Sequence, residues 1–241
     1  MQAIILAGGK GERLRPLTND RPKGMVEVGG RPILAWQIAW LRYNGVRDVI
    51  ISCGYLHEVI ERYFGDGARA GVRIRYAVEE EPLGRGGGFR YAMDLLGSDR
   101  PIVGTNGDII TNLDLRAVVR LHQQAGVMST DVLVPLQSPY GIVDVDERGY
   151  VRSFQEKPVL PYWLNGGIYL FDPMIRDLLP ERGDHEDTTF PRLAAEGRLL
   201  GYRTRSFWRP ADTIKDVTEL DRALTGRTLE EFLAAALPDE Q

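Results

Sequence analysis

The chain has 241 residues, of which 43% are hydrophobic, and its 30 basic and 34 acidic side chains give a formal net charge of −4. This length suits one α/β core, and the acidic balance argues against a nucleic-acid-binding protein, which would carry a basic face or stripe. Cys53 is the only cysteine, which excludes an intramolecular disulfide and a cluster of thiolate metal ligands. The sequence shows neither a signal-peptide pattern nor a run of about 18 apolar residues. We therefore expect a single cytoplasmic domain over residues 1–241 with no contact to a membrane.

A glycine-rich loop follows the first predicted strand. The apolar run 3–6 is typical of a buried parallel strand, and Gly8, Gly9 and Gly11 come directly after it. Without a Cβ, these glycines let backbone N–H groups turn tightly and approach an anion. Basic residues are concentrated in the same stretch, although the whole chain is acidic: Lys10, Arg13, Arg15, Arg21 and Lys23. The pattern predicts a loop that binds phosphate.

Two common glycine motifs do not fit this loop. Leu14 stands where a dinucleotide fingerprint needs its third glycine, and Gly11 stands where a P-loop needs Ser or Thr. The stretch instead resembles the signature of the sugar-nucleotide pyrophosphorylases, G-G-x-G-x-R-L-x-P-L-T followed by P-K. The matching residues are Gly8, Gly9, Gly11, Arg13, Leu14, Pro16, Leu17, Thr18, Pro22 and Lys23. The resemblance implies an enzyme that joins a nucleoside triphosphate to a sugar 1-phosphate with the help of Mg²⁺.

Strand and helix patterns alternate along the chain. Helices are predicted over residues 33–44, 57–64, 89–96, 115–124 and 213–224, and strands over 49–51, 72–78, 101–105, 130–136, 141–146 and 150–154. The last two strands have the form of a hairpin. This order predicts an α/β protein with three α/β/α layers and a mixed, mostly parallel sheet, and the resemblance implies a Rossmann-like fold of this kind.

An acidic segment, Glu79-Glu80-Glu81-Pro82-Leu83-Gly84, follows the strand 72–78. Ligands of open α/β sheets bind beyond the carboxyl ends of the strands, where this segment and the glycine loop should meet. The resemblance implies that Glu79 and the backbone around Gly84 hold the nucleobase, although Arg85 and Gly86 depart from the usual Thr-Ala. The nucleotide-binding residues that it implies are Leu6, Ala7, Gly8, Gly9, Gly11, Glu12, Arg13, Lys23, Glu79, Pro82, Leu83, Gly84, Asn106 and Gly107.

The identity of the nucleobase depends on Glu79. A carboxylate suits the N–H donors of guanine and is repelled by the two carbonyls of uracil or thymine, so GTP is the leading hypothesis. The segment 79–84 also resembles the mannose 1-phosphate guanylyltransferases. However, Trp208-Arg209-Pro210-Ala211-Asp212-Thr213 resembles the glucose 1-phosphate cytidylyltransferases, and cytosine carries an amino donor. CTP therefore stays open, as do UTP and dTTP with less support.

Two aspartates are candidate Mg²⁺ ligands. Asp108 follows the strand 101–105 and faces the glycine loop, and Mg²⁺ commonly binds one or two carboxylates together with substrate phosphates. The resemblance implies a metal ligand at Asp108 and, through the cytidylyltransferase-like variant, at Asp212. A helix-capping role is the structural alternative for each, but Asp114 is better placed than Asp108 to cap the next helix. For Asp212, capping of the helix 213–224 remains open.

Three short motifs match the sugar site of the same family in order and spacing: Tyr140-Gly141, Glu156-Lys157-Pro158 and Asn165-Gly166-Gly167. The resemblance implies that Glu156 binds sugar hydroxyls and Lys157 the sugar phosphate, with Tyr140, Gly141, Asn165 and Gly166 completing the site. Without the resemblance, the sequence would indicate an exposed ion pair at Glu156 and Lys157 and a turn at Asn165-Gly166.

The implied mechanism needs no protein nucleophile. Arg13 would hold the β- and γ-phosphates and Lys23 the region of the α-phosphate, so Arg13, Lys23 and Asp108 are the catalytic candidates. A regulatory subunit of the same fold is one alternative, but it would be free to lose these three residues. A glycosyltransferase would use a D-x-D motif, for which only Asp144-x-Asp146 is available. Residues 228–237 form an amphipathic helix that packs on its own domain or forms a homodimer contact.

Overall fold

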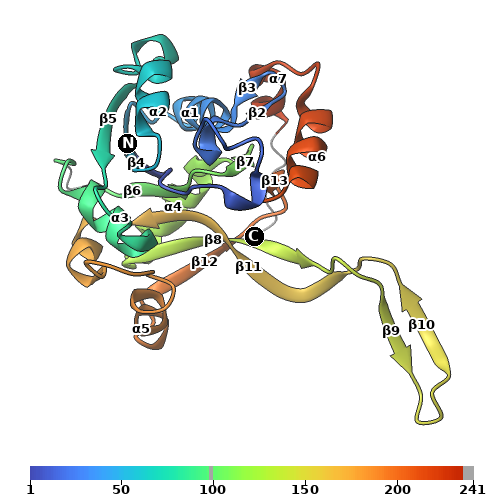
Figure 1. Ribbon diagram of the computed structural model, residues 1–241. Coiled ribbons are helices and arrows are strands. Elements are labelled where there is room, and N and C mark those ends of the chain that lie inside the picture. The colour runs from blue at the N-terminus through green and yellow to red at the C-terminus, as the bar shows by residue number, and fades with distance from the viewer. Residues whose placement is uncertain (98–99, 236–241) are drawn as a thin grey trace.

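The computed structural model describes residues 1–97 and 100–235 (Figure 1). The strands are β1 (Gln2–Leu6), β2 (Glu27–Val28), β3 (Arg31–Pro32), β4 (Asp48–Cys53), β5 (Arg73–Val78), β6 (Ile102–Asn106), β7 (Ile109–Thr111), β8 (Ser129–Gln137), β9 (Ile142–Val145), β10 (Val151–Gln155), β11 (Val159–Phe171), β12 (Leu199–Arg203) and β13 (Trp208–Pro210). The α-helices are α1 (Ile33–Tyr43), α2 (His57–Phe64), α3 (Gly84–Met93), α4 (Leu115–Ala125), α5 (Thr189–Ala195), α6 (Ile214–Leu224) and α7 (Leu229–Ala234). Short 3₁₀ turns are η1 (Glu12–Leu14), η2 (Lys23–Met25), η3 (Ala68–Ala70) and η4 (Pro173–Leu178). Within these residues no helix is long and apolar enough to cross a bilayer.

A seven-stranded sheet forms the centre of the molecule, in the order β12-β8-β11-β6-β1-β4-β5. All neighbouring pairs are parallel except those of β11, which runs antiparallel to both β8 and β6. The predicted mixed, mostly parallel sheet is therefore confirmed. Because β1 lies between β4 and β6, the loops that follow these three strands meet at one edge of the sheet.

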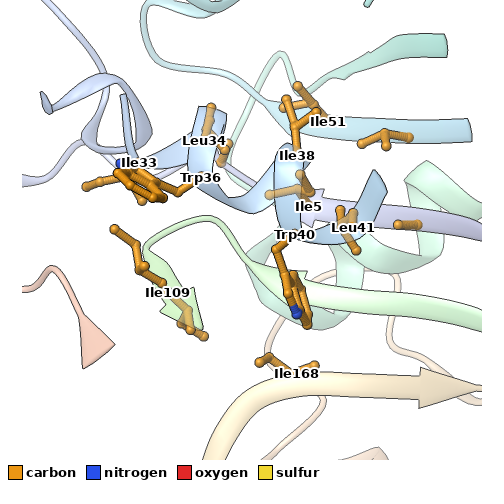
Figure 2. Close-up of a cluster of buried hydrophobic side chains, with 14 of the residues drawn as sticks. Ile5, Ile33, Leu34, Trp36, Ile38, Trp40, Leu41, Ile51, Ile109 and Ile168 are labelled. Carbon is orange, nitrogen blue, oxygen red and sulfur yellow. The ribbon is translucent and has the colours of Figure 1, made fainter. Parts of the chain in front are cut away.

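Successive side chains of each strand point to opposite faces, and each face is covered by its own helices. Ile5 belongs to the cluster that contains α1, α2 and α4, whereas its neighbour Ile4 belongs to the cluster that contains α3 and α5. Figure 2 shows Ile38 and Trp40 of α1 on the side of the helix that faces the sheet, close to Ile5 and Ile168. The predicted three layers are confirmed.

Most predicted helices and strands agree with the structure to within one or two residues, but the predicted start of α3 is wrong. The helix begins at Gly84, five positions before residue 89, and includes the glycine run that was expected to be a loop. A Cβ at Gly86 would lie 2.7 Å from Pro180, and one at Gly87 would lie 2.6 Å from the carbonyl oxygen of Glu181. Close packing against residues 180–185 therefore requires glycine there and outweighs its poor helix propensity.

The predicted C-terminal helix packs on the body of the molecule over its described part, α7. Phe232 makes edge-to-face contacts with Trp36 of α1 and with Phe207, at ring distances of 5.5 and 5.3 Å. Leu233 is buried beside it. Residues 236 and 237 of the prediction lie outside the described residues. The observed packing is that of the first alternative, in which the helix covers its own domain.

The predicted hairpin is confirmed as β9 and β10, which pair with each other in a separate two-stranded sheet. Figure 1 shows this hairpin projecting away from the body, at the end of the extended β8 and β11. We call residues 140–164 the arm. It contains the hairpin and the first part of β11.

Candidate active site

A cavity of about 1040 Å³ opens at the carboxyl ends of β1, β4, β5 and β6. This is the edge at which open α/β sheets bind their ligands. The predicted site residues in its wall are Leu6, Ala7, Gly8, Gly9, Arg13, Lys23, Glu79, Pro82, Gly84, Asn106, Gly107, Asp108, Asn165, Gly166 and Asp212. Gly11, Glu12 and Leu83 lie outside the wall. The fold thus brings together segments from the beginning, middle and end of the chain.

The glycine loop leaves β1 and is held open by local contacts. Gly11 has φ +64°, and a Cβ there would lie 2.9 Å from the methyl group of Thr18, so only glycine fits without strain. The Thr18 hydroxyl donates a hydrogen bond of 2.8 Å to the Gly11 carbonyl. The N–H groups of Gly8 and Gly9 donate no hydrogen bond to any described residue. They are available to an anion in the cavity.

A compact charge cluster stands beside this loop. The ammonium group of Lys23 donates hydrogen bonds to Asp108 Oδ2, at 2.5 Å, and to Asp212 Oδ1, at 2.7 Å. Arg13 also bonds Asp212 Oδ1, at 2.9 Å, from a largely exposed position. Burial by itself lowers the pKa of Lys23, but the charges and hydrogen bonds of the two aspartates outweigh it and raise the pKa above its ordinary value. Lys23 is therefore a fixed positive charge at the phosphate loop.

Asp212 does not cap the helix that follows it. The N-cap of α6 is Thr213, whose hydroxyl accepts a hydrogen bond from the N–H of Asp216, while the Asp216 carboxylate accepts one from the N–H of Thr213. This is a complete capping box. The capping alternative for Asp212 is therefore wrong, and its carboxylate faces Lys23 and Arg13. Asp114 caps α4, as expected, by accepting a bond from the N–H of Arg116.

Glu79 is an anchored side chain in the cavity wall. Its Oε1 accepts a hydrogen bond of 2.7 Å from the Ser52 hydroxyl, and its Oε2 accepts one of 2.9 Å from the N–H of Leu83. These bonds fix the segment 79–83 against the end of β4. Because each carboxylate oxygen has more than one acceptor position, Glu79 retains capacity for a ligand.

Arg85, Asp184 and Glu186 form an ion-pair group at the same end of the cavity. Asp184 accepts bonds from the backbone N–H and the guanidinium of Arg85, at 2.8 and 2.7 Å, and Glu186 lies 3.0 Å from the same guanidinium. The hydrogen bond from Arg85 lowers the pKa of Asp184, whereas burial raises that of Glu186. Asp184 and Arg85 line the cavity, and the pair joins the beginning of α3 to the loop before α5.

The sugar-site motifs fall into two groups. Asn165 and Gly166 lie in the cavity wall, at an irregularity of β11 where Gly167 has φ +65°. Asn165 Oδ1 accepts a bond of 2.7 Å from the N–H of Gly167, and the Gly166 carbonyl accepts one of 2.8 Å from the indole of Trp208. Bonds on both sides of the bulge hold this part of the wall in place.

The other sugar-site residues, Tyr140, Gly141, Glu156 and Lys157, lie on the arm and not in the cavity wall. They do gather with one another, since a Cβ at Gly141 would lie 3.0 Å from the Glu156 carboxylate. Lys157 has φ +48°, an uncommon value for a residue with a side chain, and its carbonyl accepts a bond from Gln137. The structure therefore places these residues at the base of the hairpin, next to the ends of β9 and β10.

Sequence reasoning assigned no individual site role to eleven residues of the wall: Lys10, Gly24, Gly54, Tyr55, Glu80, Arg85, Ile109, Gly167, Asp184, Trp208 and Pro210. Gly54 and Tyr55 follow β4, so the rule that ligands bind at strand ends could have indicated them. Asp184 lies in a loop between η4 and α5 and has no such signal. Only the packing of that loop on α3 brings it to the cavity.

Several named proteins are similar to this chain in sequence over most of its length. The mannose-1-phosphate guanylyltransferase of Mycobacterium tuberculosis is 35% identical over 236 residues, which cover 93% of this chain and 66% of that protein. A UTP–glucose-1-phosphate uridylyltransferase of Synechocystis is 35% identical over 217 residues, which cover 82% of this chain and 56% of that protein. The chain thus spans less than two thirds of the length of these relatives.

Solved structures share the fold. A putative glucose-1-phosphate thymidylyltransferase from Bacillus anthracis superposes with a TM-score of 0.77 at 23% identity, covering 95% of this chain and 96% of that one. HddC from Yersinia pseudotuberculosis gives a TM-score of 0.75 at 24% identity, with 93% and 99% covered. A family model described as nucleotidyl transferase matches residues 2–225. With this match spanning nearly the whole chain, and with the glycine loop and the Lys23 cluster in one cavity, the chain belongs to the nucleotidyl transferase family.

Proposed function

We propose that the protein joins a nucleoside triphosphate to a sugar 1-phosphate and releases pyrophosphate. The observation that carries this proposal is the position of Lys23, held between Asp108 and Asp212 beside a loop whose N–H groups are available to phosphate. The names of the relatives, which are guanylyltransferases and a uridylyltransferase of sugar 1-phosphates, support the same reaction class.

In the reaction, an oxygen of the sugar phosphate attacks the α-phosphorus of the triphosphate. A new P–O bond forms, the bond to the bridging oxygen of the β-phosphate breaks, and pyrophosphate leaves with the electron pair. The attacking phosphate oxygen is already ionised near neutral pH, so no general base is needed. Catalysis then comes from alignment and from positive charge placed around the phosphates. Lys23 would contact the α-phosphate region, Arg13 the β- and γ-phosphates, and Lys157 the sugar phosphate.

Asp108 and Asp212 fit a divalent cation. Their carboxylates converge on one point, where the Lys23 ammonium lies 2.5 and 2.7 Å from them, so two anionic ligands already share a single cation position. The described residues contain no group of three or more side chains that could hold a metal. Two carboxylates completed by substrate phosphates is the arrangement that Mg²⁺ commonly takes. When bound, Mg²⁺ would supply positive charge at the phosphates. Lys23 would then exchange its carboxylate partners for phosphate oxygens.

The anchoring of Glu79 supports GTP as the preferred nucleotide. The carboxylate is fixed by Ser52 and Leu83, so its remaining acceptor positions have a defined direction, which suits the adjacent N–H donors of guanine. Several relatives at 31–36% identity carry the name mannose-1-phosphate guanylyltransferase or guanyltransferase. The uridylyltransferase at similar identity and the cytidylyltransferase-like segment at Trp208 keep UTP and CTP as alternatives.

The sugar 1-phosphate would enter from the side of Asn165 and Gly166, which line the cavity. Glu156 would bind sugar hydroxyls, and Tyr140 and Gly141 would complete the site from the base of the hairpin. Mannose, heptose and glucose 1-phosphates are the sugar substrates that the proposal covers.

The test is release of pyrophosphate, measured with GTP, CTP, UTP and dTTP, each paired with mannose, heptose and glucose 1-phosphates in the presence of Mg²⁺. We expect release with at least one pair, highest with GTP. If a purified, folded protein releases no pyrophosphate with any pair, the proposed reaction is contradicted. A preference for UTP or dTTP would contradict the proposed role of Glu79 in binding guanine.

A further inference from the structure

Arg85 is a charged residue of the cavity wall that has no role in the reaction as described so far. It follows Gly84 in the first turn of α3, and its side chain is 46% exposed. The segment after Glu79 departs from the family signature at this position, so the resemblance assigns the side chain no task. Its surroundings in the structure indicate one.

Contacts with the loop before α5 hold Arg85 in place. Asp184 accepts hydrogen bonds from the backbone N–H of Arg85, at 2.8 Å, and from its Nη2, at 2.7 Å. The Nη1 atom lies 3.0 Å from the Glu186 carboxylate. These contacts at the backbone and at both Nη atoms orient the plane of the guanidinium. An arginine that its own chain already orients loses little conformational freedom when a ligand binds.

The loop that carries these carboxylates is itself fixed against α3. The Gly183 carbonyl accepts hydrogen bonds from the N–H groups of Gly86 and Gly87, at 2.9 and 3.2 Å. A Cβ at Gly84 would lie 2.8 Å from the Gly183 carbonyl, so this close approach requires glycine. The neighbouring Asp184 is therefore held beside the first turn of α3 before any ligand binds.

Most of the hydrogen-bonding capacity of Arg85 remains for a ligand. A guanidinium carries five N–H groups, of which Asp184 accepts from one and Glu186 lies within reach of another. The remaining N–H groups have no acceptor among the described residues. Both oxygens of Asp184, by contrast, already accept a bond from Arg85. This ion-pair group therefore offers hydrogen-bond donors on a planar cation to the cavity.

The donors of Arg85 and the acceptors of Glu79 lie at the same end of the cavity. The Glu79 carboxylate accepts a hydrogen bond from the N–H of Leu83, two positions before Arg85, and both charged residues line the wall. Guanine carries N–H donors at N1 and N2 and acceptors at O6 and N7, and arginine commonly binds O6 and N7 together. Adenine and cytosine carry an amino donor in place of O6, which a guanidinium cannot accept.

We propose that Arg85 binds O6 and N7 of guanine while Glu79 binds the N1–H and N2–H donors of the same base. This contact rests on the proposed function, because it concerns the triphosphate that the same cavity binds. It makes Arg85 a residue that determines specificity. A carboxylate at Glu79 suits an amino donor of guanine or of cytosine, whereas the guanidinium of Arg85 suits guanine alone of these two bases.

Binding of nucleotides in the absence of a sugar phosphate tests this contact separately from the reaction. In titration calorimetry with Mg²⁺, the dissociation constant of 7-deaza-GTP, in which C–H replaces N7, should exceed that of GTP by about tenfold for the wild type. Arg85→Ala should bind GTP about tenfold or more weakly and 7-deaza-GTP about equally well as GTP. ITP lacks only the 2-amino group, so the ratio of its constant to that of GTP should be the same in the variant and the wild type.

Arg182→Ala is the matched control. Arg182 also forms an ion pair, with Glu81 at 2.7 Å, but it lies outside the cavity wall, so the preference for GTP over 7-deaza-GTP should be unchanged. If Arg85→Ala fails to fold, Arg85→Lys, which keeps the charge but not the planar fork, should lose this preference. Equal binding of GTP and 7-deaza-GTP by the wild type would overturn the proposal. A variant of Arg85 that keeps the wild-type preference would also overturn it.

The contact and the reaction can fail separately. A wild type that binds GTP about tenfold more tightly than 7-deaza-GTP, loses this preference in Arg85→Ala and releases no pyrophosphate would support the contact and contradict the reaction. Release of pyrophosphate from GTP with no preference over 7-deaza-GTP would contradict the contact alone. Absence of measurable GTP binding by the folded wild type would contradict the contact as well.

Discussion

The charge cluster of the cavity and the arm differ in how fully the chain covers its own side chains. Lys23 is only 14% exposed and is bonded on two sides by Asp108 and Asp212, which come from distant parts of the sequence. Phe154 is 64% exposed and faces Val143 across a hairpin that pairs with no other strand of the described residues. The first region is covered by its own chain, and the second is exposed to solvent.

This difference separates the residues proposed for the triphosphate from those proposed for the sugar phosphate. The groups proposed for the triphosphate are fixed before any substrate binds, because hydrogen bonds and ion pairs already orient them. Four of the six groups proposed for the sugar phosphate lie at the base of the hairpin, which projects from the body (Figure 1). Changes in the cluster should therefore act mainly on catalysis, and changes in the arm mainly on binding of one substrate.

The largest effect is expected from Asp108→Asn. This variant removes a carboxylate proposed to hold Mg²⁺ and leaves Lys23 with one anionic partner, so turnover should fall on the order of 10²-fold or more. Steady-state release of pyrophosphate measures it, and circular dichroism checks the fold. Asp20→Asn, which removes a surface carboxylate paired with Arg21, is the control and should retain activity. Full activity of Asp108→Asn would contradict the metal assignment.

Lys23→Ala comes next, with an expected loss of about tenfold to a hundredfold. If Lys23 contacts the α-phosphate region as charge builds up, kcat should fall more than KM rises. The same variant should bind Mn²⁺ without nucleotide more tightly than the wild type, because Asp108 and Asp212 lose the ammonium that competes for them. A change in KM alone would make Lys23 a binding residue only.

Glu79→Gln should change which triphosphate is preferred. Replacing the carboxylate with an amide removes an acceptor for guanine and supplies a donor for uracil or thymine, so the ratio of kcat/KM for GTP to that for UTP should fall by about tenfold or more. Comparing the four triphosphates measures this ratio. An unchanged ranking would mean that Glu79 only anchors residues 79–83 through Ser52 and Leu83.

Lys157→Ala should raise KM for the sugar 1-phosphate several-fold and leave KM for the triphosphate nearly unchanged. Lys157 is proposed to contact the sugar phosphate, and it lies outside the cavity wall that contains the glycine loop. Kinetics with each substrate varied in turn separate the two constants, and Arg148→Ala, at the tip of the hairpin, is the control. Equal effects on both constants would contradict the division of the site.

The smallest effect is expected from Thr213→Ala. This variant tests whether the cap of α6 also positions the carboxylate of the neighbouring Asp212. Loss of the capping box should lower the free energy of unfolding by about 1 kcal/mol. Because Thr213 does not line the cavity, turnover should stay close to that of the wild type. Chemical denaturation and pyrophosphate release measure the two quantities. A large loss of turnover at unchanged stability would show that the cap positions Asp212.

The parts that the sequence predicts well are those encoded locally. The strand–glycine loop unit, the helix 57–64 and the hairpin each follow from periodicity and turn residues within one short segment. The start of α3 was missed because three consecutive glycines are poor helix formers, and only contact with residues 180–185 shows why glycine is required. The 13-residue β11 was missed because its proline and glycines are typical strand breakers.

The site shows the same limit. Lys23 could be predicted because it belongs to the family signature, and Asp108 because it follows the end of a predicted strand. The structure places both in the cavity wall. The pairing of Arg85 with Asp184 could not, since the two residues are far apart in sequence and meet only through loop packing. The direction of the arm depends on the path of β8 and β11, which no local pattern specifies.

The central claim is that the cavity transfers a nucleotidyl group to a sugar phosphate. The most direct measurement is pyrophosphate release with GTP and Mg²⁺ in the presence and in the absence of mannose, heptose or glucose 1-phosphate. The account predicts release only when a sugar 1-phosphate is present, with one pyrophosphate formed for each nucleotide-sugar. Equal release without any sugar phosphate, which would be hydrolysis of the triphosphate, would contradict it.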